Sequence, residues 1–116
     1  MILTIWLVGL EVKAMTCPIE IAVNLIGDKW KILILKRLLD HKILRFGELS
    51  RELVGISQKM LSQQLRRMEQ DGLVIRTIYA SIPPRVEYSL TDLGKSLDPV
   101  VDVLYQWGKY YVSLSS

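Results

Sequence analysis

Residues 53–72, with the sequence LVGISQKMLSQQLRRMEQDG, decide the fold of this 116-residue chain. Gly55 breaks the helical pattern that precedes it, and Ser57 is a good N-cap for a helix from Gln58 to about Gln70. The Asp-Gly pair at the end of the stretch stops this second helix. Two helices joined by so short a turn are typical of a helix-turn-helix unit.

The second of these helices has an apolar side and an opposite side that is polar and free of acids. At 100° per residue, Leu61, Leu65 and Met68 fall in one stripe, which predicts the side that faces the core. The opposite side carries Lys59, Ser62, Gln63, Arg66 and Gln70, with Arg67 beside it and Glu69 at its edge. Solvated helix faces usually mix Glu with Lys. Because Gln pairs with adenine and Arg or Lys with guanine, this side predicts a helix that reads the major groove of DNA.

The segments that precede this unit predict more helices. The predicted helices cover residues 18–26, 29–39 and 46–53, and a brief strand covers 43–45. Pro18 suits a first helical turn, Gly27 ends the first helix, and Asp28 can cap the next one.

A hairpin and a final helix follow the helix-turn-helix unit. Residues 73–79 and 85–90 are rich in β-branched and aromatic side chains, and residues 81–84 form the turn between them. Thr91 is expected to cap one final helix that continues past Tyr111. The predicted fold class is therefore α+β and mostly helical: a winged helix-turn-helix with N- and C-terminal helices forming a dimer interface.

The charges are unevenly distributed along the chain. Residues 29–85 hold 12 Lys/Arg against 5 Asp/Glu, whereas the remainder holds 3 against 7. A cationic middle between acidic, apolar ends favours a nucleic-acid partner, with a solvated charged surface as the alternative. Arg76 and Arg85 lie near the predicted hairpin, and Ser81 lies at its tip. Arg85 is expected either to contact the DNA backbone or minor groove, or to pair with Glu87.

The first ten residues, MILTIWLVGL, are almost wholly apolar. They are too short to span a bilayer, which takes about 20 residues, and no basic leader precedes them. Residues 1–14 are interpreted as an apolar extension that contacts a second subunit or as a start-site artefact, since Met15 offers another start. Residues 15–116 are interpreted as one DNA-binding domain.

The sequence contains none of the common catalytic motifs. It has no HExxH, GxSxG, CxxC or phosphate-loop pattern, and its only histidine, His41, is expected in a turn, where nothing in the sequence indicates a partner for it. The single cysteine, Cys17, excludes a disulfide framework and a cysteine zinc site and suits the cytoplasm. We therefore predict no catalytic residue, metal site, cofactor or membrane association.

Three long runs of the chain resemble the HxlR family of bacterial winged-helix regulators. They are CPIEIAVNLIGDKWKILILKRLLD (17–40), RFGELSRELVGISQKMLSQQLRRMEQDGLVIRTIY (45–79) and PPRVEYSLTDLGKSL (83–97). The resemblance implies a homodimer on a pseudo-palindromic operator, with the first and last helices at the dimer interface. The residues expected at that interface are Ile5, Trp6, Ile19, Val23, Leu104, Trp107, Tyr110 and Tyr111.

The resemblance also makes Cys17 a candidate sensor of oxidants or electrophiles, because some family members use a cysteine near the start of the first helix. The alternative is a buried, inert thiol. The predicted function is that of a DNA-binding transcriptional regulator. The alternative is a winged-helix module that binds other proteins, and RNA binding is a third alternative with less support. The expected DNA contacts are Ser57, Gln58, Lys59, Ser62, Gln63, Arg66, Arg67, Arg76, Ser81 and Arg85. No inducer is indicated.

Overall fold

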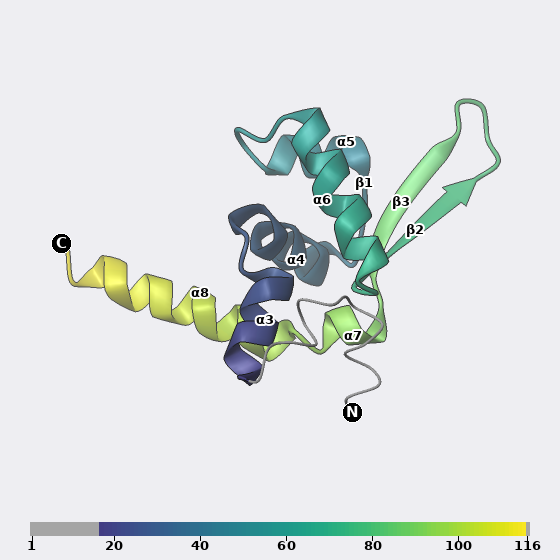
Figure 1. Ribbon diagram of the computed structural model, residues 1–116. Helices are drawn as coiled ribbons and strands as arrows, with labels where there is room; N and C mark the ends of the chain where they lie inside the picture. The colour runs from purple at the N-terminus through teal and green to yellow at the C-terminus, as the bar shows by residue number, and fades with distance from the viewer. Residues whose placement is uncertain (1–16, 116) are drawn as a thin grey trace.

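The computed structural model describes residues 17–115, and its elements follow the predicted order (Figure 1). They are α3 (Pro18–Ile26), α4 (Lys29–His41), β1 (Ile43–Arg45), α5 (Phe46–Glu52), α6 (Gln58–Gln70), β2 (Val74–Tyr79), β3 (Arg85–Leu90), α7 (Asp92–Lys95) and α8 (Asp98–Ser113). The winged helix-turn-helix fold is thereby confirmed. The predictions for residues 1–14, including Ile5 and Trp6, lie outside the described residues.

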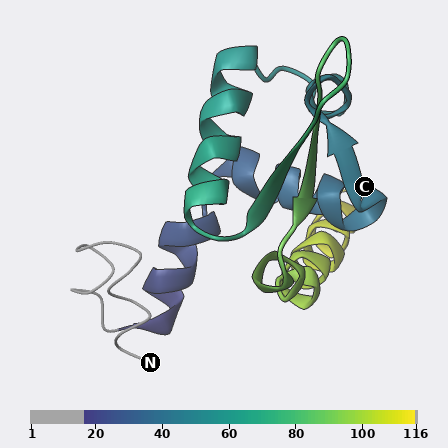
Figure 2. The same cartoon turned by 90° about the vertical axis from the view of Figure 1, so that its right-hand side faces the viewer.

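The three strands form one antiparallel sheet in the order β1-β3-β2. The register sets Leu44 opposite Tyr88 and Val74 opposite Leu90, and all four side chains are buried. Because side chains alternate along a strand, this face of the sheet packs on the helices and the other faces outward. The β2–β3 hairpin extends beyond the helices as the wing (Figures 1 and 2).

The core lies between α4, α5, α6 and the inner face of the sheet. Its fully buried side chains are Ile34, Leu35, Leu38, Leu49, Leu61, Leu65 and Met68. Burying one such side chain stabilises the fold by about 1.5–3 kcal/mol. Leu61, Leu65 and Met68 belong to α6, so the core fixes the rotation of that helix about its own axis.

Side-chain caps begin three of the helices at the predicted residues. The Asp28 carboxylate accepts the Trp30 N–H at 2.8 Å, and the Ser57 hydroxyl accepts the Met60 N–H at 3.0 Å. Thr91 accepts the Gly94 N–H at 3.0 Å and donates its hydroxyl proton to the Gly72 carbonyl at 2.6 Å. This last pair of bonds ties the start of α7 to the turn after α6.

The prediction of one continuous final helix was wrong, because α7 ends at Lys95 and α8 begins at Asp98. Pro99 lies in the first turn of α8. Inside a continuous helix its ring would collide with the carbonyl of Lys95, four residues earlier, and it has no N–H to donate. The proline therefore divides the segment into a short helix and a long one.

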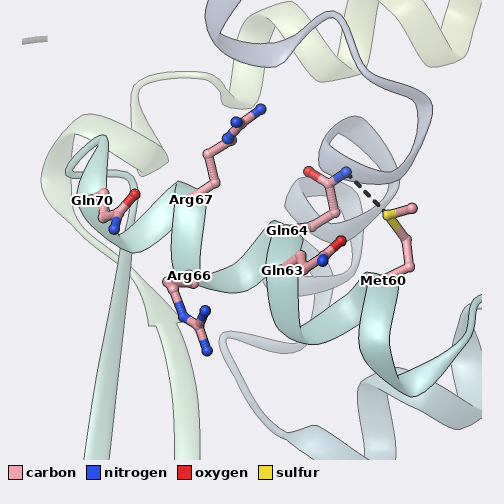
Figure 3. Close-up of a pocket in the computed structure, with 6 residues that line it drawn as sticks. All are labelled: Met60, Gln63, Gln64, Arg66, Arg67 and Gln70. Atoms are coloured by element: carbon pink, nitrogen blue, oxygen red, sulfur yellow. Dashed lines mark hydrogen bonds between the residues drawn. The ribbon is translucent and has the colours of Figure 1, made fainter. Parts of the chain in front are cut away.

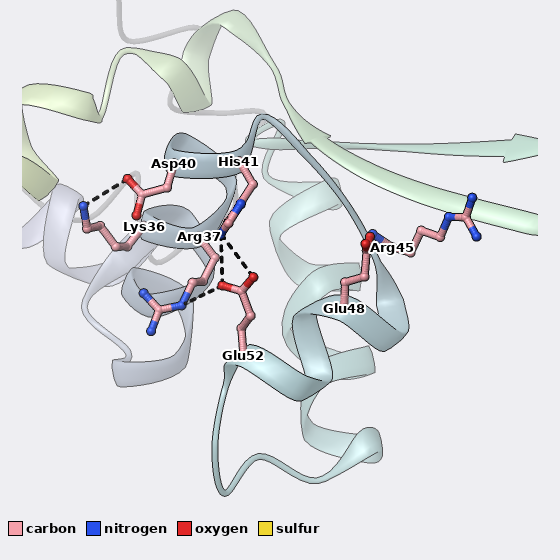
Figure 4. Close-up of polar contacts among 7 residues, drawn as sticks. All are labelled: Lys36, Arg37, Asp40, His41, Arg45, Glu48 and Glu52. Atoms are coloured by element: carbon pink, nitrogen blue, oxygen red, sulfur yellow. Dashed lines mark hydrogen bonds and ion pairs between the residues drawn. The ribbon is translucent and has the colours of Figure 1, made fainter.

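The prediction that His41 lies in a turn was also wrong, and the histidine has a partner that the sequence did not indicate. His41 is the last residue of α4, and its Nε2 lies 3.1 Å from the Glu52 Oε2 (Figure 4). The Arg37 Nε lies 3.3 Å from the other oxygen of the same carboxylate. Glu52 thus connects the end of α5 to two side chains of α4, which helps hold the first helix of the helix-turn-helix unit.

Candidate nucleic-acid interface

The two sides of α6 are arranged as its periodicity predicts. Leu61, Leu65 and Met68 are buried, and they turn the polar side of the helix toward solvent. The exposed side chains on and just before α6 include Ser57, Gln58, Lys59, Ser62, Gln63, Arg66, Arg67 and Gln70. Among residues 17–115, none of the large apolar side chains that are exposed belongs to α6. The helix therefore offers hydrogen-bond donors, acceptors and positive charge, but no apolar anchor of the kind that protein interfaces use.

Figure 3 shows how these side chains extend from α6. A hollow of about 410 Å³ runs along the helix and is lined by Met60, Gln63, Gln64, Arg66, Arg67 and Gln70. Arg66 and Arg67 extend to opposite sides of the helix, and Gln63 lies on the same stretch (Figure 3). None of these lining residues is acidic. The positive charge and the amide groups of this lining suit an anionic ligand that forms hydrogen bonds, such as DNA bound through its groove.

Gln64 is a polar residue of α6 that the predicted contacts left out. It is half-buried, and its amide Nε2 donates to the Met60 sulfur at 3.5 Å. Its Oε1 is buried and has no hydrogen-bond partner among the described residues. At 300° on the helical wheel, Gln64 adjoins the apolar stripe, and this is the signal that sets it apart from its exposed neighbour Gln63.

The two arginines of the wing lie on opposite faces of the hairpin. Arg76 is paired with Tyr88, on the face that turns toward α6, and it lines a hollow of about 250 Å³ together with Ser62, Arg66 and Glu69. Arg85 is paired with Tyr79 on the outer face. The structure therefore groups Arg76 with the candidate recognition helix and Arg85 with the wing tip, a separation that the sequence did not reveal.

Arg85 is already engaged within the hairpin. Its Nε lies 3.4 Å from the Glu87 carboxylate, and its guanidinium lies 4.4 Å from the centre of the Tyr79 ring. The alternative that the sequence left open, a pair with Glu87, is thus present, while the side chain stays exposed to a further ligand. Ser81, the other expected contact of the wing, is exposed at the tip and donates its hydroxyl proton to the Pro83 carbonyl at 2.7 Å.

The start of α6 and the tip of the wing lie at one edge of the molecule. In both views the start of α6, the helix α5 and the tip of the wing lie at the upper edge, whereas α3, α7 and α8 lie at the lower one (Figures 1 and 2). The helix-turn-helix unit and the wing can therefore face one ligand together, and the lower edge remains free for another contact.

The lower edge carries an uncovered apolar surface. Only Val101 of α8 is buried, although the helix is 16 residues long. The described residues expected at a dimer interface are exposed: Ile19, Val23, Leu104, Trp107, Tyr110 and Tyr111. The rings of Trp107 and Tyr111 stack with their centres 5.5 Å apart. Exposed apolar side chains in this number are typical of an interaction surface.

Cys17, the candidate sensor, lies directly before α3 and is half-buried. Its side chain makes no capping hydrogen bond to α3, and Glu20 lies in the first turn of that helix. Among the described residues there is no cluster of three or more His, Cys, Asp or Glu side chains that could hold a metal ion. Within the same part of the chain, no helix has both the length and the apolar composition needed to cross a bilayer.

Comparison with known proteins agrees with this architecture. The model of the HxlR-like helix-turn-helix family matches residues 25–116. An uncharacterised HTH-type transcriptional regulator of Methanothermobacter thermautotrophicus is 52% identical over 97 residues, which are 84% of this chain and 73% of that protein. The structure of the redox regulator HypR in its oxidised form has a TM-score of 0.77 at 42% identity and covers 81% of this chain and 96% of its own. The structure of the reduced transcriptional regulator YodB from Bacillus subtilis has a TM-score of 0.70 at 37% identity. The match covers 80% of this chain and 91% of that one.

Proposed function

This chain belongs to the HxlR-like helix-turn-helix family, and we propose that it regulates transcription by binding a specific duplex DNA site as a homodimer. The observation that carries the proposal is the side of α6 opposite its buried stripe, which is polar and cationic and has the exposed acid Glu69 at its edge. Its side chains are Lys59, Ser62, Gln63, Arg66 and Gln70, all of them exposed. They combine positive charge for the phosphates with the amide and guanidinium groups that distinguish one base from another.

In the proposed complex, α6 lies in the major groove and the wing lies beside it. A helix of 13 residues is about 20 Å long, so its first three turns can lie in the groove while its apolar stripe remains in the core. Gln63 and Arg66 are the side chains best suited to read bases, because both can form paired hydrogen bonds with a base edge. The residues assigned to the groove walls and the flanking phosphates are Ser57, Gln58, Lys59 and Arg67.

The apolar surface of α3 and α8 supports the homodimer in this proposal. A two-fold pair joined through that surface would present two copies of α6 about 34–36 Å apart, which is one turn of DNA. A module that binds protein through α6 is less well supported, since no large apolar side chain is exposed on α6 among residues 17–115. We further propose that the protein has no catalytic role and acts in the cytoplasm, as a reduced Cys17 would suit.

The test begins with selection of bound duplexes from a random pool, followed by gel shifts with the selected site. Arg66→Ala and Gln63→Ala should each weaken binding to that site by about 10- to 100-fold, because a paired base contact is worth about 1–3 kcal/mol. Lys95→Ala is the matched control, since it removes one exposed charge from the lower edge and should leave the affinity unchanged. Unchanged affinity in both α6 variants would overturn the assignment of this helix to the groove.

A further inference from the structure

A second cationic hollow lies between the tip of the wing and the start of α5. It measures about 470 Å³, and its apolar lining includes Phe46, Ile82, Pro84 and Val86. Two arginines, Arg45 and Arg85, also line it. The wing tip and α5, which border the hollow, lie on the same upper edge as the start of α6 (Figures 1 and 2).

Arg45 differs from Arg37 and Arg85 in having no paired carboxylate among the described residues. Its backbone N–H donates to the Glu48 carboxylate at 2.7 Å, but among residues 17–115 no carboxylate forms an ion pair with its guanidinium. Figure 4 shows the side chain extending away from Glu48, whereas Arg37 is directed at Glu52. Arg45 is also exposed, so its full positive charge is available to a ligand in the hollow.

The strand register brings Arg45 and Arg85 to one face of the sheet. Arg45 is opposite Glu87, and Arg85 lies two residues from Glu87 on the same strand. Diagonal neighbours of this kind are about 7–8 Å apart, which is within reach of two long side chains around one small anion. Glu87, which is opposite Arg45 in the register, forms its ion pair with Arg85, at 3.4 Å.

From these contacts we infer that Arg45 binds a backbone phosphate of the DNA strand that passes between the wing and α5. Guanidinium groups suit phosphate oxygens because they donate two parallel hydrogen bonds. Arg85 approaches the same phosphate from the wing, and the deoxyribose lies against the apolar lining formed by Phe46 and Pro84. This inference rests on the proposed function and adds Arg45 to its contacts.

The test compares wild type, Arg45→Ala and the control Lys95→Ala in titrations of the selected site and of an unrelated duplex, over a range of salt concentrations. Because a phosphate carries no sequence information, Arg45→Ala should weaken binding to both duplexes by the same factor, about tenfold. The slope of log K against log salt should become shallower by about 1. Arg45→Lys should recover part of the affinity and all of the slope, since it keeps the charge and loses the paired geometry.

Neutral methylphosphonate groups, placed one at a time along the selected site, then locate the contact. Wild type should lose affinity at several positions in each half-site, and Arg45→Ala should lose much less at one of them while responding as wild type does at the others. An Arg45→Ala variant that is folded by circular dichroism and keeps wild-type affinity and slope would overturn the inference, as would a loss confined to one sequence. If wild type bound no duplex at all, the proposed function itself would fail. That result differs from one in which wild type binds DNA and Arg45→Ala binds it equally well, which would overturn only the assignment of Arg45.

Discussion

Replacing Ser57 should separate the stability of α6 from its binding to DNA. The Ser57 hydroxyl accepts the Met60 N–H at 3.0 Å and begins the helix. Ser57→Ala leaves that N–H without its acceptor, which should lower the free energy of unfolding by about 1 kcal/mol. In a domain of this size the change corresponds to a fall in Tm of about 4 °C. Ser57→Asp keeps a capping oxygen and adds a negative charge that favours the helix N-terminus, so its Tm should match or exceed that of wild type.

DNA binding should rank the same variants differently. In the proposed complex the start of α6 lies close to phosphates, and a carboxylate at position 57 is repelled by them. Ser57→Asp should therefore bind the selected site at least about tenfold more weakly than wild type, a cost of about 1.4 kcal/mol, even though its fold is at least as stable. Ser57→Ala should lose less affinity, because it adds no charge.

The assay is thermal unfolding at one fixed protein concentration, since a dimer makes Tm depend on concentration, together with gel shifts on the selected site. Asp28→Ala is the matched control. It removes the cap of α4, whose carboxylate accepts the Trp30 N–H at 2.8 Å, and should cost about the same 1 kcal/mol without changing DNA affinity. Wild-type affinity in Ser57→Asp would show that the start of α6 does not approach DNA.

Two further predictions concern the lower edge of the molecule. Trp107→Asp places a charge in the apolar surface of α8, where Trp107 is 60% exposed, and should convert the proposed dimer to a monomer in light scattering, whereas Ile82→Asp at the wing tip should not. A dimeric Trp107→Asp variant would show that another surface joins the subunits. Cys17→Ser should remove any loss of DNA binding that diamide causes in wild type, and a variant that responds to diamide as wild type does would exclude Cys17 as the sensor.

The sequence predicted most of the fold because the deciding signals were local. The stripe of Leu61, Leu65 and Met68 repeats at the helical period, and the caps at Asp28 and Ser57 depend on neighbours two or three residues away. The division of the last helix was missed although its cause, Pro99, is also local; the apolar periodicity continues through the proline and concealed the break.

The parts of the candidate site that the sequence did not predict depend on tertiary structure. That Arg76 and Arg85 lie on opposite faces follows from the strand register, which pairs Arg76 with Tyr88 and Arg85 with Tyr79. Arg45 was missed because its approach to the wing tip joins segments about 40 residues apart in sequence, and such contacts leave no local pattern.

The separation of the two edges limits how a change at Cys17 could affect DNA binding. Cys17 lies at the start of α3, on the lower edge with α8, whereas the start of α6 and the wing tip lie on the upper edge (Figure 1). The rotation of α6 is fixed by its buried stripe, and Glu52 fixes α5 against α4 through Arg37 and His41. A chemical change at Cys17 therefore has no direct contact with the groove-facing side chains. In the proposed homodimer, an effect on DNA binding is expected to act through the apolar surface of α3 and α8, by changing the distance or angle between the two copies of α6.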